Sequence, residues 1–336
     1  MEKEKVFLIC RLIEKSGTNV AARIGEKCGV SRQAASAWLS SLKKEGVIGS
    51  AGVGRGTIYF LRSLITNEQI YVRDGLSEDT VWREFVYSAV QDLPQNVSGI
   101  WHHGITEMVN NAIDHSGGKT VTVRIRRNAL YTECEVSDNG EGIFLKIQRA
   151  LDLYDPREAI LELAKGKFTT DPANHTGEGI FFSSRMFDFF VIRSDALAFV
   201  HTGNDHADVL LTNDASEEGT SVVMRIDNDS ARTAKEIFDK FALPEEFSFA
   251  KTIVPVRLAT HEGENLVSRS QAKRLTRRFE RFETVMLDFS GVGEIGQAFA
   301  DEVFRVFSSA HPAINMVPIR MTPEVKAMIE RVQRAT

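Results

Sequence analysis

The segment from Gly104 to His115 constrains the fold more than any other part of the chain, because it carries two distinct faces of one helix. Apolar residues recur at i, i+3, i+4, i+7 and i+8: Ile105, Met108, Val109, Ala112 and Ile113. This period predicts a helix with one buried stripe. The neighbouring face repeats the spacing with two carboxylates, an amide and an imidazole: Glu107, Asn111, Asp114 and His115. Such a set has little purpose on a plain solvated surface, so we expect the helix to line a polar site.

Three glycine-containing segments follow this helix in the chain. The alternating residues of 120–126 and 130–137 predict an antiparallel hairpin that ends in DNGEG at 138–142. The sequence TGEGI at 176–180 opens an apolar helix, and amide groups at a helix start attract phosphate. A Gly-Thr pair at 219–220 leads a further strand, so its hydroxyl could face the same cavity.

These four pieces in this order resemble the GHKL ATPase superfamily, which includes gyrase B, Hsp90, sensor histidine kinases, MutL and the anti-sigma-factor serine kinases. The resemblance covers roughly residues 81–240, and the combination is far more specific than any single motif. It implies an α/β sandwich that binds ATP with Mg²⁺. The cofactor-binding residues that it implies are Asn111, Asp114, Asp138, Gly140, Gly142, Thr169, Gly177, Gly179 and Thr220.

The resemblance also implies individual roles. Asn111 would ligate Mg²⁺, which prefers hard oxygen ligands and bridges phosphate oxygens. Glu107 would be the catalytic residue, a general base that polarises a water or an acceptor hydroxyl. Asp138 would accept a hydrogen bond from the adenine amino group, supported by the hydroxyl of Thr220, and residues 143–176 would form the ATP lid.

The histidines of this region are expected to be structural. His102 and His103 have no second cluster that supplies further metal ligands, and His115 is expected to pack beside the phosphates. One departure from the family concerns the lid. Family members commonly carry a further glycine where this chain has His175, which predicts a less closely wrapped lid and slow hydrolysis.

Charge is unevenly distributed along the chain. Residues 1–62 carry eleven Lys and Arg against five Glu, a net charge of +6. Because the whole chain carries −5, the remaining residues carry −11. A basic head on an acidic body suggests that the N-terminal part binds a polyanion.

Apolar spacing in residues 1–64 predicts helices that end at 16–17, at Gly29 and at Lys44, followed by a hairpin with a glycine-rich tip. This pattern resembles the winged helix-turn-helix domains of bacterial transcription regulators. In that fold the third helix enters the major groove. The resemblance therefore implies DNA contacts by Arg32, Gln33, Ser36, Ser40 and Lys43 and by Arg55 of the wing. The alternative is a winged helix used only for protein contact.

The C-terminal part predicts a small α/β domain over residues 245–336, because strands alternate with helices such as Asn265 to Phe282. Its segment VMLDFSGVGEIGQAFADEVFRVF resembles STAS-like domains. The best-known members of that family are bacterial anti-sigma antagonists, which are phosphorylated on a serine that follows a buried strand. Gly296 and Gln297 stand at that position, so the phosphoacceptor is absent. Basic residues recur at helical spacing: Arg269, Lys273, Arg274, Arg277, Arg278 and Arg281. They predict a solvated face or a contact with the acidic ATPase domain, rather than a second nucleic-acid surface.

Together these patterns predict an α/β protein, α+β overall, with a winged helix at 1–64, a linker at 65–80, a GHKL domain at 81–242 and the STAS-like domain at 245–336. Cys10, Cys28 and Cys134 form no disulfide framework and no CxxC spacing, and no apolar run is long enough to span a membrane. We therefore expect a cytoplasmic protein without a membrane partner.

Two hypotheses for function remain open. The first is a DNA-binding transcriptional regulator, expected to be a homodimer, in which Mg·ATP in the GHKL domain modulates the winged helix and the STAS-like domain contacts a protein partner. The alternative is a serine/threonine protein kinase of the anti-sigma-factor type, or a weak ATPase, in a partner-switching pathway.

Overall fold

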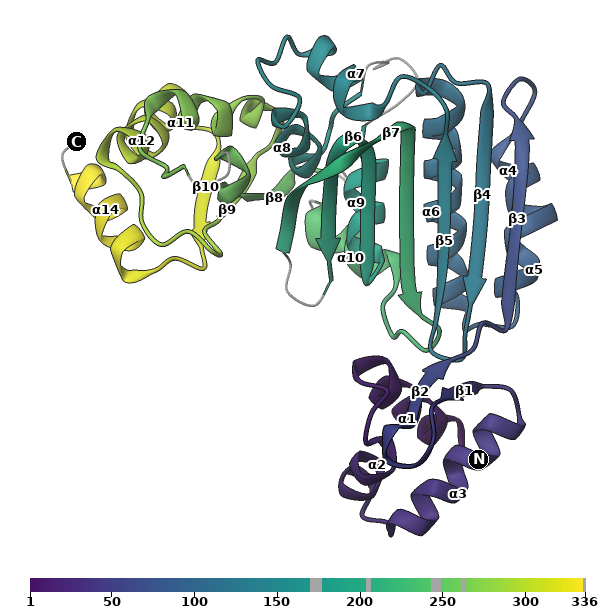
Figure 1. The fold of residues 1–336 in the computed structure, drawn as a ribbon. Coiled ribbons are helices and arrows are strands. Elements are labelled where there is room, and N and C mark those ends of the chain that lie inside the picture. Colours follow the sequence, from purple (N-terminus) through teal and green to yellow (C-terminus); the bar gives the residue numbers. More distant parts are fainter. Residues whose placement is uncertain (170–176, 204–206, 243–248, 261–263, 335–336) are drawn as a thin grey trace.

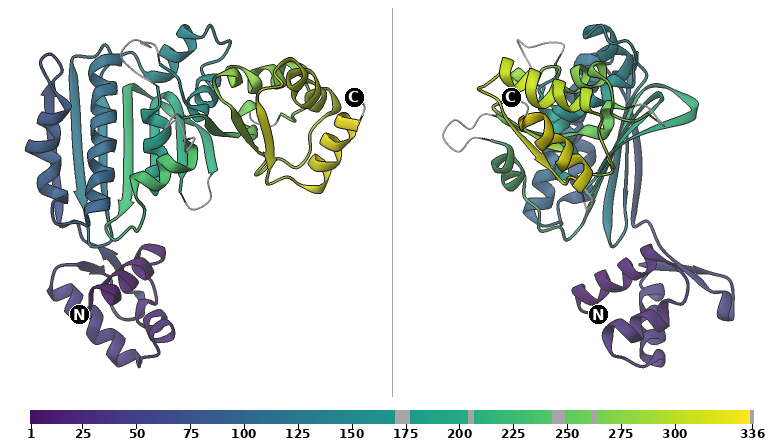
Figure 2. Two further views of the ribbon diagram at one scale, coloured as in Figure 1. Left: turned by 180° about the vertical axis from the view of Figure 1, so that it is seen from behind. Right: turned by 90° about the vertical axis from the view of Figure 1, so that its left-hand side faces the viewer.

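The computed structural model describes residues 1–169, 177–203, 207–242, 249–260 and 264–334. The chain forms an N-terminal domain (residues 1–64), a central domain (65–242) and a C-terminal domain (249–334), drawn in Figure 1. The N-terminal domain lies below one end of the central sheet, and the C-terminal domain lies beside one edge of that sheet (Figures 1 and 2). No described helix is long and apolar enough to cross a membrane.

The N-terminal domain has the three helices and the hairpin that the sequence predicts. Its elements are α1 (Lys3–Lys15), α2 (Val20–Cys28), α3 (Arg32–Lys44), β1 (Ile48–Ala51) and β2 (Ile58–Leu61), with β1 and β2 antiparallel. The side chain of Ser31 caps α3 by accepting a hydrogen bond from the Ala34 amide. Apolar residues at helical spacing, among them Ile9, Ile24 and Leu39, form a separate core in this domain.

The central domain is a five-stranded antiparallel sheet with helices on one face. The strand order is β3 (Ile65–Val72), β4 (Thr120–Arg127), β5 (Tyr131–Asp138), β7 (Ala207–Asp227) and β6 (Phe189–Thr202). The helices are α4 (Glu78–Val81), α5 (Tyr87–Val90), α6 (Gln95–His115), α7 (Ile143–Ala150), α8 (Glu158–Lys165), α9 (Gly179–Met186) and α10 (Ala234–Phe241), with a π-helical turn at Trp82–Val86. Residues Ile105, Met108, Val109 and Ala112 of α6 are buried, as the apolar stripe predicts.

The prediction that residues 65–80 form a linker is wrong for residues 65–72. Residues 65–72 form β3, which pairs with β4 along its whole length and is the edge strand of the sheet. Ile65 and Tyr71 of β3 pack against the core, while most of the residues between them are exposed. With only these two partly buried side chains, the segment lacks the alternation of apolar and polar residues that indicates a strand. The sequence pattern therefore does not predict β3.

The C-terminal domain contains a parallel three-stranded sheet in the order β10 (Asn315–Ile319), β9 (Thr284–Asp288), β8 (Lys251–Pro255). Its helices are α11 (Arg269–Thr276), α12 (Gln297–Asp301), α13 (Ser308–Ala310) and α14 (Pro323–Arg334), with a π-helical segment at Glu302–Phe307 and short 3₁₀ turns at Val256–Ala259 and Phe279–Arg281. The predicted alternation of strands and helices is confirmed. In the segment that resembles STAS-like domains, β9 is followed by α12.

The helix expected from Asn265 to Phe282 is shorter than predicted. It begins at Arg269 because Ser268 and Gln271 form a capping box, and it ends at Thr276. Arg278 has a left-handed backbone conformation (φ 64°), which an α-helix does not contain. The basic residues of this region therefore do not form one continuous helical stripe.

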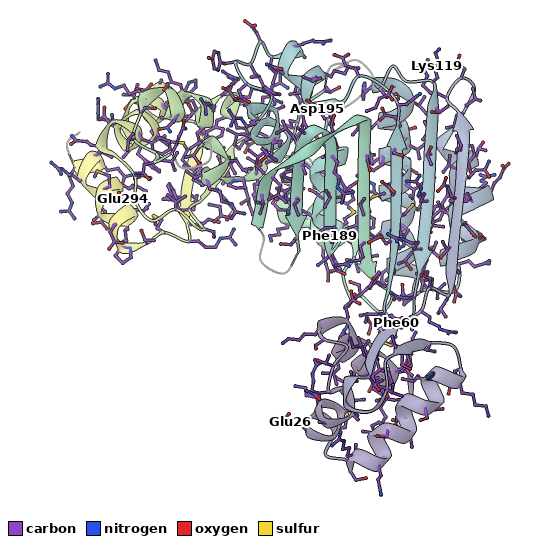
Figure 3. All side chains as sticks on the ribbon, in the orientation of Figure 1. Glu26, Phe60, Lys119, Phe189, Asp195 and Glu294 are labelled. Carbon is purple, nitrogen blue, oxygen red and sulfur yellow. The ribbon has the colours of Figure 1, made fainter. Side chains whose placement is uncertain are left out.

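Helix α1 joins the N-terminal domain to the central sheet. Phe7 and Cys10 pack against Leu130 in the turn between β4 and β5. Arg11 forms ion pairs with Asp227 (3.2 Å) and Asp229 (3.1 Å) at the end of β7. Phe60 is labelled at this junction in Figure 3, whereas Lys119 marks the opposite end of the sheet.

The three cysteines are all unpaired, and they differ in exposure. Cys10 and Cys134 are buried, and Cys28 is partly exposed. Burial raises the pKa of Cys10 to about 11 and also raises the pKa of Cys134. We therefore expect a chromogenic disulfide reagent near neutral pH to react rapidly with one thiol in the folded chain and with all three after denaturation. Rapid reaction of a second thiol, or retention of the fast phase in Cys28→Ser, would contradict the assigned burial.

Candidate nucleotide-binding site

A cavity of about 290 Å³ lies between α6, the end of β5, the part of β7 around Thr220, α7 and the start of α9. It is lined by eight of the ten site residues that the sequence predicts for this domain: Glu107, Asn111, Asp138, Gly142, Thr169, Gly177, Gly179 and Thr220. His115 also lines it, as expected. Segments more than 100 residues apart in the chain therefore meet around one space.

Two predicted residues do not line this cavity. Asp114 is exposed and is not part of the cavity lining, although its neighbour His115 on the last turn of α6 lines the cavity. Gly140 lies behind the cavity wall, where its amide donates a hydrogen bond to Asp138 Oδ1 (2.9 Å). His175 and Thr176, and with them the last residues of the expected lid (170–176), lie outside the described residues.

Asp138 is the last residue of β5 and is partly buried at the cavity wall. Burial is the largest influence on its carboxyl group and raises its pKa, while hydrogen bonds from the backbone amides of Gly140 and Thr220 act in the opposite direction. The pairing of β5 with β7 sets Thr220 directly opposite Asp138. A carboxylate and a hydroxyl therefore share one end of the cavity, where they can recognise a polar ligand edge.

Gly142 allows the chain to turn from β5 into α7. Its φ of 94° lies in the left-handed region, which side chains rarely adopt, and a Cβ there would overlap the hydroxyl of Ser194. The next amide, that of Ile143, donates to Thr220 Oγ1 (3.0 Å). The turn is thereby fixed against β7, which explains why the sequence DNGEG stands at this point.

Glu107 and Asn111 lie one turn apart on α6 and face the cavity together. Gly179, the first residue of α9, approaches Glu107 so closely that a Cβ would overlap Glu107 Oε2. The start of α9 therefore lies directly against a carboxylate on α6. Amide groups at a helix start favour an anionic ligand, so this end of the cavity suits phosphate groups with a bridging cation.

The structure adds lining residues that sequence reasoning missed. Val136 and Val222 lie two residues from Asp138 and Thr220 on their strands, and strand alternation could have identified them. Lys146, on α7, lines the cavity and donates to the His115 carbonyl (2.6 Å). Leu163 and Phe168 also line it, and no local pattern marks them.

The residues present fit a magnesium nucleotide. Among the described residues, no cluster of three or more His, Cys, Asp or Glu could hold a metal ion by itself. Mg²⁺ usually keeps several waters and takes one or two protein oxygens together with substrate phosphates. The amide oxygen of Asn111 can supply such a ligand, and valines between the polar ends of the cavity can cover the faces of a purine.

The neighbouring histidines of α6 pack against aromatic side chains. Burial lowers the pKa of His103 to about 4, so its imidazole is neutral near neutral pH. His103 packs edge-on against Phe238, and His102 packs edge-on against Trp82. Neither residue lines the cavity.

Fold and site together define an ATPase-type nucleotide-binding domain joined to a second α/β domain. Residues 97–230 match the family model of the histidine kinase-, DNA gyrase B-, and HSP90-like ATPases. Residues 271–326 match the model of a STAS-like domain of unknown function. A comparison with curated proteins finds no match. The chain therefore combines a GHKL ATPase domain with a C-terminal STAS-like domain, which supports ATP binding and a regulatory role.

Proposed function

We propose that this chain is a DNA-binding regulator that holds Mg·ATP in the cavity and binds DNA through α3, with nucleotide occupancy controlling the DNA-bound state. The observation that carries the proposal is the convergence of Asp138, Thr220, Asn111 and Glu107 on one cavity in a chain whose basic N-terminal domain leaves α3 exposed. Asp138 and Thr220 bind the adenine edge, Asn111 ligates Mg²⁺, and the backbone at Gly177 and Gly179 contacts phosphate.

Support for the DNA-binding part comes from the two faces of α3. Ala35, Leu39 and Leu42 are buried, whereas the residues predicted to contact DNA are exposed: Arg32, Gln33, Ser36, Ser40 and Lys43. The helix lies on the part of the N-terminal domain away from the central sheet (Figure 1). Lys43 Nζ donates to Ser50 Oγ (2.7 Å), which connects α3 to the hairpin. The side chain of Arg55 is not among the described ones.

The proposed control acts at a distance. The N-terminal domain contacts Leu130 and Asp227, whereas the cavity is lined by Asp138 at the other end of β5 and by its pairing partner Thr220 within β7. Seven residues of β5 separate the two ends by about 23 Å, at roughly 3.3 Å per residue. A nucleotide therefore does not touch α3. It changes the lid and the association of two chains in a homodimer, and this sets the spacing of the two α3 helices.

A mobility-shift assay on DNA from the chain's own promoter region tests this proposal. We expect Mg·ATP to change the affinity of the wild-type chain for this DNA, and Asn111→Ala to abolish the change because magnesium is no longer ligated. Asn110→Ala is the matched control, since Asn110 has the same side chain on the same helix and does not line the cavity. Identical shifts with and without Mg·ATP would remove nucleotide control.

Phosphoryl transfer to a separate protein is the second candidate function. It is favoured by the carboxylate of Glu107, which lines the cavity beside Asn111 in the place that a general base needs. The acceptor would have to be a separate protein, because Gly296 and Gln297 supply no hydroxyl to the expected site in the chain's own STAS-like domain. Incubation with radiolabelled ATP and candidate STAS partners distinguishes the two functions: label on a partner favours the kinase, and retained ATP without transfer favours the regulator.

A further inference from the structure

Helix α8 lies in the expected lid, and all eight of its residues are buried. Three of them carry charge: Glu158, Glu162 and Lys165 are 5%, 1% and 0% exposed. Buried charges are stable only when they are paired or fully hydrogen-bonded. The partners of these three groups therefore show what α8 is built to contact.

The partners of the two carboxylates come from the C-terminal domain. Glu158 pairs with Arg274 (3.3 Å) and Arg277 (3.4 Å), and Glu162 pairs with Arg278 (3.0 Å). Arg274, Arg277 and Arg278 therefore contact the ATPase domain, which is one of the two alternatives that the sequence left open. These contacts join the lid to residues more than 110 positions later in the chain.

Lys165 is bound from both domains. Its ammonium group donates to Glu162 (2.7 Å) within α8 and to the backbone carbonyls of Arg274 (3.2 Å) and Arg277 (2.9 Å). Its own carbonyl accepts a hydrogen bond from Thr252 on β8 (2.7 Å). Burial lowers the pKa of Lys165 to about 8 even with these partners. The contact is thus a desolvated, specific interface rather than a loose surface pairing.

The same contacts continue to the wall of the cavity. Arg278 donates to the carbonyl of Lys167 and lies over the ring of Phe168, 5.3 Å from its centroid. Arg281 also donates to the Lys167 carbonyl (2.9 Å). Phe168 lines the cavity, as does Leu163 of α8. The segment from α8 to Phe168 therefore lines the cavity and also contacts the C-terminal domain. Figure 1 shows α8 beside that domain.

We propose that the STAS-like domain regulates the nucleotide site in cis: its docking on α8 holds Leu163 and Phe168 against the cavity, so that docking and Mg·ATP binding stabilise each other. This proposal rests on the proposed nucleotide function of the cavity. Linkage requires the coupling to be reciprocal, so loss of the docked state weakens nucleotide binding by the factor by which nucleotide strengthens docking. A signal that releases the domain would then weaken nucleotide binding.

The rate of release of a fluorescent ATP analogue with Mg²⁺ tests the first half of this coupling. We expect the full-length Arg278→Gln variant to bind the analogue on the order of 10-fold more weakly than wild type, calculated from its release and association rates and within the usual range of allosteric coupling. Because this change leaves Glu162 with fewer partners, the double variant Glu162→Gln/Arg278→Gln is measured beside it. Arg305→Gln is the matched control, since Arg305 pairs with Asp301 (2.5 Å) in the same domain and away from α8.

Hydrogen exchange of the wild-type chain tests the second half and needs no variant. We expect Mg·ATP to slow amide exchange in residues 269–281, which do not line the cavity, and to leave exchange in α14 unchanged. If wild type binds no nucleotide, the proposed function fails. If it binds nucleotide but residues 269–281 are unaffected, the coupling is overturned. An affinity for the analogue that is unchanged or higher in the folded variants also overturns it.

Discussion

Replacing Asp138 with asparagine is expected to weaken ATP binding on the order of 100-fold, the largest effect of any single change in the cavity. Asp138 is the partly buried carboxylate at the end of β5, held by the Gly140 amide and set opposite Thr220. A hydrogen bond to a charged group contributes about 1.5–3 kcal/mol, so its loss weakens binding by roughly 10- to 150-fold.

The same variant is expected to change base selectivity. A carboxylate only accepts hydrogen bonds and therefore selects the amino group of adenine, whereas an asparagine amide can also donate to the 6-oxo group of guanine. The ratio of ATP to GTP affinity should therefore fall further than the affinity for ATP alone would indicate. Calorimetric titration of wild type and Asp138→Asn with each nucleotide measures both quantities.

Glu141→Gln is the matched control for this experiment. Glu141 belongs to the same DNGEG turn, but it is exposed, pairs with Arg149 and does not line the cavity. Its replacement should leave both affinities within about twofold, because exposed ion pairs contribute little. Equal losses in the two variants would indicate a disturbed turn rather than a lost adenine contact, and unchanged binding in Asp138→Asn would exclude Asp138 from recognition.

The cavity could be predicted from sequence to the extent that its residues repeat with a local period. Glu107 and Asn111 follow the helical period beside an apolar stripe, and the glycines at 142 and 179 stand where the chain must turn or approach another segment closely. The helical spacing and the turns are each determined by a few residues that are adjacent in the sequence. Asp114 shows the limit of the method, because it follows the same period and yet is exposed, whereas the next residue, His115, lines the cavity.

The contact between α8 and the C-terminal domain could not be predicted in this way. Glu158, Glu162 and Lys165 have the spacing of an ordinary solvated helix face, and their burial is decided by Arg274 and Arg278, which lie far along the chain. Contacts of this kind depend on how two domains pack against each other, and the spacing of residues within one helix carries no information about that packing. β3 was missed for a related reason, since its pairing with β4 rather than its own pattern makes it a strand.

Removing the two side chains at the start of α3 is expected to reduce DNA affinity more than any other change in the N-terminal domain. Arg32 and Gln33 are exposed in the first turn of the proposed recognition helix, whose N-terminal residues reach base edges in this class of fold. A good bidentate contact to a base is worth about 1–3 kcal/mol. Arg32→Ala/Gln33→Ala should therefore weaken binding to the promoter DNA on the order of 100-fold or more.

Salt dependence distinguishes base contacts from phosphate contacts in the same helix. Lys43→Ala, at the other end of α3, should lower the slope of log affinity against log salt by about one if Lys43 contacts a phosphate, and it should weaken binding to all sequences alike. The double variant at positions 32 and 33 should lose discrimination between promoter and unrelated DNA instead. Fluorescence anisotropy titrations at several salt concentrations measure both effects.

Lys235→Ala provides the control for charge alone. Lys235 is an exposed residue of α10 that pairs with Asp239, so its removal changes the net charge as Arg32→Ala does without altering α3. DNA affinity should stay within about twofold of wild type, because long-range interactions between exposed charges are largely screened at physiological salt. If Lys235→Ala weakened binding as much as the α3 variants, the chain would bind DNA through its charge without specific contacts, and α3 would not be the recognition helix.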